Sequence, residues 1–308
     1  MELKSPDRFP DKPAFDIFLL VSANLIWGGT DVAAKLAMSE MTPEALAWTR
    51  FTIALLAFAP ALWVNRSEIP RSIRGLAPFV VLGACGFFLN QVLTYRGLKL
   101  APASHATALR VTESLVIAAL SAIFLREHIG KKTTVALVAG LVGVILVLNV
   151  DLKNLSLFAS GYRFGDMLIL ASIFIESFYT IIGKKVLAKT RPLTSTALAC
   201  FFGWLMMSIF YGGAISREFI RHPPSVNFYL LSAYLGLIAN AFGYWVYYEV
   251  LSRRASHRVG ISIMIQPMVG IPLAAAVFGD SITPKFLIGA LLIAAGVYMA
   301  LGKEKHIE

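Results

Sequence analysis

Apolar residues gather into ten long runs along this chain of 308 residues, and most charged residues fall in the short segments between them. A helix needs roughly 20 mostly apolar residues to cross the hydrocarbon core of a bilayer. Proline lies at or near the start of several runs, where its missing N–H costs little. The pattern predicts ten transmembrane helices, over residues 14–37, 43–64, 76–96, 101–124, 131–150, 164–186, 192–215, 226–250, 254–278 and 284–302.

The connections between the runs are too short to fold into a separate domain. The first run is longer than the roughly 7–15-residue apolar core of a signal peptide, so we interpret it as an uncleaved span. The predicted layout is a tail at 1–13, five helices at 14–150, a linker at 151–163, five helices at 164–302 and a tail at 303–308. Any function is therefore expected within the membrane region.

Lys and Arg are divided unevenly between the two ends of the predicted helices. Segments on the side of the N-terminus hold 18 of them, segments on the opposite side hold 7, and three lie within the runs. Short loops rich in Lys and Arg stay in the cytoplasm. The bias predicts that both termini are cytoplasmic and that the linker 151–163 is periplasmic.

An internal repeat relates the two groups of five runs. A shift of 150 residues places Asp16 on Asp166, and a shift of 153 places Tyr95 on Tyr248. Each half has an odd number of runs, so the second half is expected to be inverted. Inverted repeats are a recurring plan of secondary transporters, which bind substrate near the midplane between the halves. The expected fold is an all-α membrane protein of two inverted five-helix repeats around a central cavity.

Composition agrees with a lipid environment. Hydrophobic residues make up 57% of the chain and charged residues only 15%, against about 25% in soluble domains. A net charge of +10 raises the question of nucleic acid, but the basic residues sit where they set orientation, so no nucleic-acid partner is expected. Cys85 and Cys200 lie inside apolar runs and suggest neither a metal site nor a disulfide. No metal and no cofactor are expected.

Several short motifs occur in the order typical of a known family. They are NLIWGG at 24–29, AAK at 33–35, Arg50-Phe51, Glu127, GA at 289–290 and AGV at 295–297. Together with the doubled five-helix layout, they make the chain resemble the EamA family of the drug/metabolite transporter superfamily. In detail it is most similar to the YddG-type bacterial amino-acid exporters.

The resemblance implies a central cavity open to one side and lined mainly by the first, third and fourth spans of each half. It also implies export of amino acids, aromatic ones among them, or other metabolites across a bacterial inner membrane by a monomer or homodimer. The second half departs from the pattern, because Ser177-Phe178-Tyr179 stands where Trp27-Gly28-Gly29 stands in the first. The two sides of the cavity therefore need not contact substrate equally.

Polar residues inside a membrane are costly, so each needs a partner, a cavity or a function. In the first run Asn24, Trp27, Asp31 and Lys35 share one helical face. They are explained either by packing, with Asp31 and Lys35 as an ion pair, or by a cavity wall with Trp27 as a stacking surface. Asn24 and Trp27 are the expected substrate contacts.

The third run holds two adjacent amides, Asn90 and Gln91, with Thr94 and Tyr95 one turn further on. Lipid offers no hydrogen-bond partners to two adjacent side-chain amides. They are expected either to bond to other helices or to line the cavity, and we include both among the substrate-binding candidates.

Arg110 and Glu113 lie one turn apart in the middle of the fourth run. One interpretation is a structural ion pair. The other is a site for a zwitterion, in which the guanidinium holds a carboxylate in fork geometry and Glu113 meets the ammonium. The repeat equivalents, Ile263 and Gln266, are uncharged, so a charged site here would be asymmetric.

The sixth run carries Glu176 near its middle, followed by Tyr179. A mid-span carboxylate is either buried in its protonated form or used in coupling. Asp31, Glu113 and Glu176 are therefore candidate proton-coupling groups, although facilitated diffusion would need none.

The eighth and ninth runs add further candidates. Tyr244 is the expected cavity residue of the eighth run, whereas Tyr247 and Tyr248 near its cytoplasmic end are interpreted as interfacial aromatics. In the ninth run Gln266 precedes Pro267, and the proline is expected to kink or hinge the helix.

An enzyme and a channel are the alternatives from other classes. The sequence contains no nucleophile-elbow, zinc-protease or P-loop motif, and its five histidines lie in loops, in the tail or near a helix end. The chain is therefore not expected to be an enzyme. A channel would favour rings of like residues, which are not visible. Among transporters, a multidrug exporter or an exporter of other metabolites is the alternative to amino-acid export.

Overall fold

The computed structural model describes residues 13–101, 103–147, 162–278 and 285–301. These residues form helices joined by short turns, with no strand among them, which confirms the all-α prediction. In chain order the helices are α1 (Pro13–Gly28), α2 (Thr30–Ala37), α3 (Pro43–Val64), η1 (Arg66–Glu68), α4 (Ile73–Leu82), η2 (Gly83–Leu89), α5 (Asn90–Leu100), α6 (Ala103–Leu120), η3 (Ser121–Leu125), α7 (Lys131–Val147), α8 (Arg163–Leu187), α9 (Pro192–Arg221), α10 (Val226–Ala233), η5 (Tyr234–Tyr244), α11 (Trp245–Arg253), α12 (Ser256–Ile261), η6 (Ser262–Ile265), α13 (Gln266–Phe278) and α14 (Lys285–Leu301).

Seven helical segments of the described chain are long and apolar enough to cross a membrane. They are Pro13–Ala37, Pro43–Val64, Ile73–Leu100, Arg163–Leu187, Pro192–Arg221, Val226–Arg253 and Ser256–Val277. Each coincides with one of the predicted runs. The helices α6, α7 and α14 occupy the other three runs, and ten spans stay a prediction. Most of the two tails and of the linker 151–163 lies outside the described residues.

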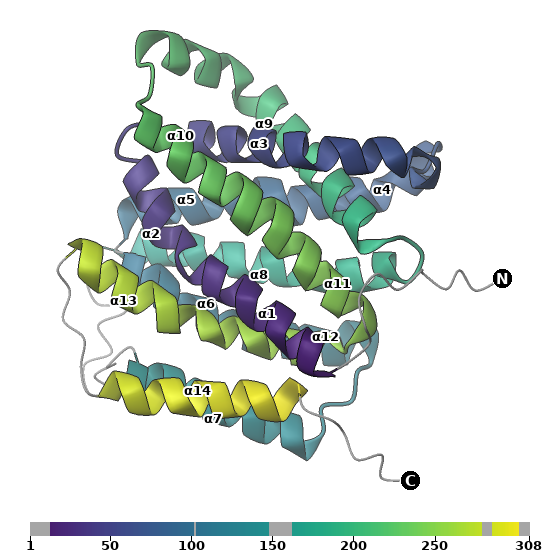
Figure 1. Ribbon diagram of the computed structural model, residues 1–308, viewed down its shortest axis with the longest axis vertical. Helices are drawn as coiled ribbons and strands as arrows, with labels where there is room; N and C mark the ends of the chain where they lie inside the picture. The colour runs from purple at the N-terminus through teal and green to yellow at the C-terminus, as the bar shows by residue number, and fades with distance from the viewer. Residues whose placement is uncertain (1–12, 102, 148–161, 279–284, 302–308) are drawn as a thin grey trace.

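The chain crosses the bundle from side to side, and α1 begins on the same side as α14 ends (Figure 1). At one edge α7 packs along α14. Toward the opposite edge α3 packs against α9 and η5. Between these edges α8 contacts both α5 and α6, and α1 contacts α13. The central helices are therefore shielded on two sides by peripheral pairs.

Glycines allow the closest of these packing contacts. A methyl group at Gly143 would lie 2.7 Å from the carbonyl oxygen of Gly289, and one at Gly296 would lie 2.8 Å from that of Ala136. Small residues at helix crossings let backbones approach in a membrane, where dispersion contacts replace the hydrophobic effect. The two contacts are related by the same 153-residue shift as the sequence repeat.

The third and eighth predicted runs each contain a π-helical stretch, η2 and η5. Such wide turns are rare and occur often at functional sites. The first, η2, packs on α9, and the second, η5, packs on α3. A methyl group at Gly83 of η2 would meet the carbonyl oxygen of Ala199 at 2.7 Å, and one at Gly236 of η5 would meet that of Arg50 at 2.5 Å. Both π-helical stretches thus pack closely against the backbone of a neighbouring helix.

Charged side chains close several helix ends. Lys35 donates to the carbonyl of Ala101 at 3.0 Å, and Lys184 donates to that of Arg254 at 2.8 Å. These carbonyls belong to the residues that follow α5 and α11. Cations are favourable near the unpaired carbonyls at a helix C-terminus. Lys35 therefore caps a helix and is not the partner of Asp31, so the expected ion pair between them is wrong.

Glu127 closes the start of α12 from the segment before α7. Its carboxylate accepts from the backbone N–H of Ser256 at 2.9 Å and of His257 at 3.3 Å, and it lies 2.8 Å from Nδ1 of His257. Burial alone would raise the pKa of Glu127, but the bonds from His257 and Ser256 lower that pKa to about 2. The contact joins the segment between the fourth and fifth predicted spans to the second half.

We predict that Glu127→Gln lowers the apparent melting temperature in detergent at pH 7, with a loss of about 1 kcal/mol typical of a helix cap. A depressed folded-state pKa stabilises above the unfolded pKa, near 4.5, and this contribution is lost as pH falls toward 2. The melting temperature of the wild type should thus fall more steeply than that of the variant between pH 5 and pH 3. Parallel curves for the two proteins would contradict the assigned role.

Candidate functional site

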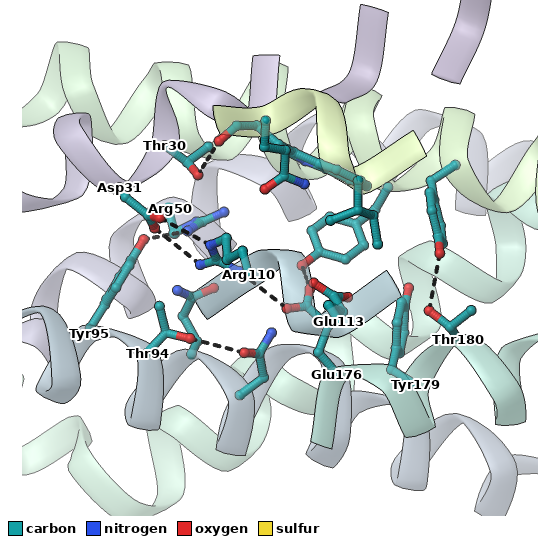
Figure 2. Close-up of a pocket in the computed structure, with 17 residues that line it drawn as sticks. Thr30, Asp31, Arg50, Thr94, Tyr95, Arg110, Glu113, Glu176, Tyr179 and Thr180 are labelled. Atoms are coloured by element: carbon teal, nitrogen blue, oxygen red, sulfur yellow. Dashed lines mark hydrogen bonds and ion pairs between the residues drawn. The ribbon is translucent and has the colours of Figure 1, made fainter. Parts of the chain in front are cut away.

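A cavity of about 50 Å³ lies in the interior of the bundle (Figure 2). Its lining comes from both halves of the chain: Trp27, Thr30, Asp31, Arg50, Asn90, Gln91, Thr94, Tyr95, Arg110, Glu113, Glu176, Tyr179, Thr180, Tyr244, Tyr247, Ile263 and Gln266. This volume has room for a few water molecules, whereas pockets for drug-sized ligands measure roughly 300–1,000 Å³. Side chains or helices must move before a metabolite can enter.

Most of the residues singled out from the sequence meet at this cavity. Nine of the ten candidates for substrate contact line it, as do the three candidate coupling carboxylates. The exception is Asn24, which is fully buried beside the cavity wall. Its amide donates to Leu20 and to Ser262, and it accepts from Gln266 at 3.1 Å. Asn24 therefore positions Gln266, while a binding role for the lining residues stays a prediction.

Arg110 is the most strongly bound charge at the cavity. Its Nε and Nη2 atoms donate to the two oxygens of Asp31 at 3.0 and 3.1 Å, and Nη1 lies 3.6 Å from Glu176 (Figure 2). This is the two-pronged geometry in which guanidinium and carboxylate bind best. The fork that we assigned to a substrate carboxylate is thus filled by Asp31.

The two glutamates at the cavity differ in their surroundings. Glu176 on α8 accepts a hydrogen bond of 2.7 Å from the hydroxyl of Tyr244 in addition to its contact with Arg110. Glu113 on α6 is 4% exposed, and no residue of the described chain hydrogen bonds its carboxyl group. A buried carboxylate without a hydrogen-bond donor is unfavourable, so Glu113 is poised to take a proton or a cation.

Arg50 is a cavity residue that our sequence reasoning did not propose for binding. It is 4% exposed on α3 and donates to the hydroxyl of Tyr95 and to the side-chain oxygen of Asn240. The signal was present, since Arg50 is a charge within a predicted span and such charges are functional candidates by default. Its partners lie 45 and 190 residues away in the sequence, so no local pattern reveals that they meet.

Aromatic rings form one wall of the cavity. The ring centroids of Trp27 lie 5.1 Å from Tyr244 and 5.5 Å from Tyr247, and Tyr179 stacks on Tyr248 at 4.8 Å. Tyr247 is 3% exposed and Tyr248 is fully buried. Their assignment to the membrane interface is therefore wrong. Both rings are buried in the bundle, where they pack on Trp27 and Tyr179.

The amides of the third run contribute to the opposite wall. Asn90 donates to Gly86 within its own span, and the hydroxyl of Thr94 lies 3.1 Å from the side-chain oxygen of Asn90 and 2.9 Å from the hydroxyl of Ser172. The bond of Thr94 to Ser172 reaches from α5 to α8. Both amides line the cavity, whereas the described bond between helices is made by Thr94.

The ninth run is irregular next to the cavity, as the proline suggested. The regular helix gives way to the 3₁₀ turn η6 immediately before Gln266 and Pro267. The break brings Ile263 and Gln266 to the lining. It also leaves Ser262 as the acceptor of the bond from Asn24.

Charged groups of both signs give the cavity its chemistry. Three carboxylates and two guanidinium groups line it, which leaves one excess negative charge when all are ionised. No group of three metal-binding side chains occurs among the residues that the structure describes. The cavity is suited to a small polar or charged molecule with an apolar part, and to a proton that balances the charge.

Comparison with known proteins identifies a family. The family described as the EamA-like transporter family matches residues 14–149 and again residues 163–302. A Salmonella typhimurium protein described as a probable amino-acid metabolite efflux pump is 27% identical over 293 residues, which cover 92% of this chain and 94% of its own. An Escherichia coli protein with the same description is 24% identical over 281 residues, covering 89% of this chain and 91% of its own.

Two further comparisons agree. An Archaeoglobus fulgidus protein described as an uncharacterized transporter is 28% identical over 291 residues, covering 93% of this chain and 97% of its own. A solved protein structure aligns with a TM-score of 0.72 at 20% identity, covering 93% of this chain and 96% of its own. At that identity the likeness shows a shared fold.

We predict that Arg110→Gln lowers stability by about 3–5 kcal/mol, because it leaves Asp31 and Glu176 buried without their counter-charge. Adding Asp31→Asn should restore part of the loss, since the two changes act on one contact. Apparent melting temperature in detergent measures both effects. Arg66→Gln, a change outside the cavity, is the control and should stay within about 0.5 kcal/mol of the wild type.

A loss for Arg110→Gln no larger than that for Arg66→Gln would contradict the structural role of the Arg110 contact. Full additivity of the Arg110 and Asp31 changes would contradict their direct pairing.

Proposed function

Because this chain belongs to the EamA-like transporter family, we propose that it exports amino acids, aromatic ones included, or related small metabolites across a bacterial inner membrane by alternating access. The chain is a multi-pass membrane protein with a transport role on small molecules, which is not an enzymatic one. The observation that carries the proposal is a buried cavity with charges of both signs, lined from both halves of the chain. Two relatives described as amino-acid metabolite efflux pumps support the substrate class.

The proposed architecture is ten spans in two inverted five-helix repeats, at 14–150 and 164–302. The family matches twice, once in each half. Packing supports the same division, because the α7–α14 contact and the contacts of η2 and η5 recur under one sequence shift. Five crossings per half reverse the second half, and an even total agrees with α1 starting on the side where α14 ends.

The proposed orientation places both termini in the cytoplasm, with the linker 151–163 in the periplasm. The excess of Lys and Arg in the segments on the side of the N-terminus supports it. Export then means that substrate enters the cavity from that side and leaves from the other. A monomer or a homodimer would serve, because the cavity is lined by one chain.

Transport requires the cavity to open, since its present volume of about 50 Å³ is too small for an amino acid. Movement between the two halves would widen it on one side at a time, as in other carriers built from inverted repeats. Contacts that join the halves across the cavity, such as Arg110 with Glu176, would have to change during this movement. The charges at this contact are thus parts of the interface that would move during transport.

We further propose that Asp31, Glu113 and Glu176 couple transport to protons. The three carboxylates outnumber the two guanidinium groups of the cavity, and an uncompensated charge is unfavourable away from water. A proton would remove the excess when no substrate cation is present. The same excess favours a second candidate function, export of organic cations, for which the aromatic wall would also be suited.

The test is uptake of each of the twenty labelled amino acids into liposomes that contain the purified protein, with and without a pH gradient. We expect uptake and counterflow of one or more amino acids, and a severalfold change of the initial rate with the gradient. Glu113→Gln should keep the protein folded and abolish the effect of the gradient. A tag placed after the C-terminus reports orientation and should be inaccessible from outside intact cells.

Folded protein that carries none of the twenty amino acids would contradict amino-acid export, and uptake of tetraphenylphosphonium instead would favour the cation alternative. Amino-acid uptake that ignores the gradient would contradict proton coupling alone. An externally accessible C-terminal tag would contradict the orientation.

A further inference from the structure

Arg50 carries a buried positive charge without an acidic partner among the described residues. Its guanidinium donates to Tyr95 and Asn240, which are neutral, and lies over the rings of Phe51 and Tyr95 at 5.7 and 5.8 Å. Its Nε and the Nδ2 of Asn240 are both buried without a hydrogen-bond acceptor in that part of the chain. A buried guanidinium with spare donors beside a cavity is a site for an anion.

Arg110 is unlike Arg50 in this respect. Both oxygens of Asp31 accept from it, and Glu176 lies 3.6 Å away on its other side. Two carboxylates thus already surround this guanidinium. A substrate carboxylate at Arg110 would have to displace one of them, so Arg110 is a positioning residue that joins α2, α6 and α8.

Glu113 supplies the opposite charge. It lines the same cavity from α6, and no described residue donates to its carboxyl group. Arg50 is thus a cation with no acidic partner among the described residues, and Glu113 is a carboxyl group with no hydrogen-bond donor there, although it lies within electrostatic range of Arg110 and Glu176. In the view of Figure 2, Glu113 lies near the centre of the drawn residues and Arg50 lies to its left.

We propose that Arg50 binds the carboxylate and Glu113 the ammonium of a zwitterionic substrate. The aromatic wall of Trp27, Tyr244 and Tyr247 would then receive an apolar side chain. This inference rests on the proposed export function and narrows its substrate to molecules with both a free amino and a free carboxyl group. It assigns the anion to Arg50 in place of Arg110, which sequence reasoning had favoured.

The test compares three compounds of one carbon skeleton in liposomes. They are the labelled amino acid that the wild type carries fastest among the twenty, its decarboxylated amine and its deaminated acid, the last two as unlabelled competitors. The wild type should prefer the amino acid over both. Arg50→Gln should reduce the preference for the amino acid over the amine at least about tenfold, as expected for loss of a charged hydrogen bond, and leave the affinity for the amine nearly unchanged.

A second variant guards against a folding defect in the first. Asn240→Asp places a carboxylate beside the guanidinium and so supplies the partner that it lacks. It should reduce the preference for the amino acid over the amine at least as strongly as Arg50→Gln, while its melting temperature stays at or above that of the wild type. Arg66→Gln, in the short helix η1 that follows α3 and outside the cavity, is the matched control and should keep the wild-type preference.

Complementary behaviour is expected of Glu113→Gln, which should reduce the preference for the amino acid over the deaminated acid. The proposal is overturned if Arg50→Gln weakens amino acid and amine equally, or if Asn240→Asp carries the amino acid as the wild type does. Absence of uptake for all twenty amino acids by the folded wild type would instead contradict the proposed function itself, so the two failures are distinguishable.

Discussion

Burying charge away from water dominates the physics of this molecule. A guanidinium or carboxylate in the interior of a membrane bundle is tolerated only when oppositely charged or strongly polar groups surround it. Arg110 meets that condition through Asp31 and Glu176, which approach it from two other helices. Three helices of different sequence position are thereby held at one point. These charged groups converge on the cavity and form part of its lining.

The scaffold around this point is nearly symmetric, and the charges are not. The two glycine contacts between α7 and α14 are related by the repeat, and the π-helical stretch η2 of the first half has its counterpart η5 in the second. Lysines cap equivalent carbonyls after α5 and α11. By contrast, Arg110 and Glu113 have the uncharged equivalents Ile263 and Gln266. A symmetric frame can give two similar conformations facing opposite sides, whereas an asymmetric set of charges allows a single binding orientation.

Sequence patterns were sufficient for the helices and for most cavity residues. The position of a membrane helix and the importance of a polar residue within it can be predicted from the cost of solvating each residue. This cost depends on the residue itself and not on its distant partners. Which polar groups pair depends on helices that are distant in sequence. For this reason the sequence suggested a pair of Asp31 with its neighbour Lys35, whereas Asp31 in fact binds Arg110. Asn24 was likewise expected to line the cavity, whereas its side chain bonds to Ser262 beside the cavity wall. Tyr247 was assigned to the membrane interface because it lies near the end of its predicted helix, which says nothing of the side to which it points.

In the proposed transport cycle, the charged cavity faces the two sides of the membrane alternately. This alternation is tested most directly by a single cysteine at Thr30, a lining residue, after Cys85 and Cys200 are replaced by alanine. A membrane-impermeant thiol reagent is applied to right-side-out and to inside-out vesicles. We predict labelling from both sides, with substrate changing the two rates in opposite directions. Labelling from one side only, with or without substrate, would contradict the account.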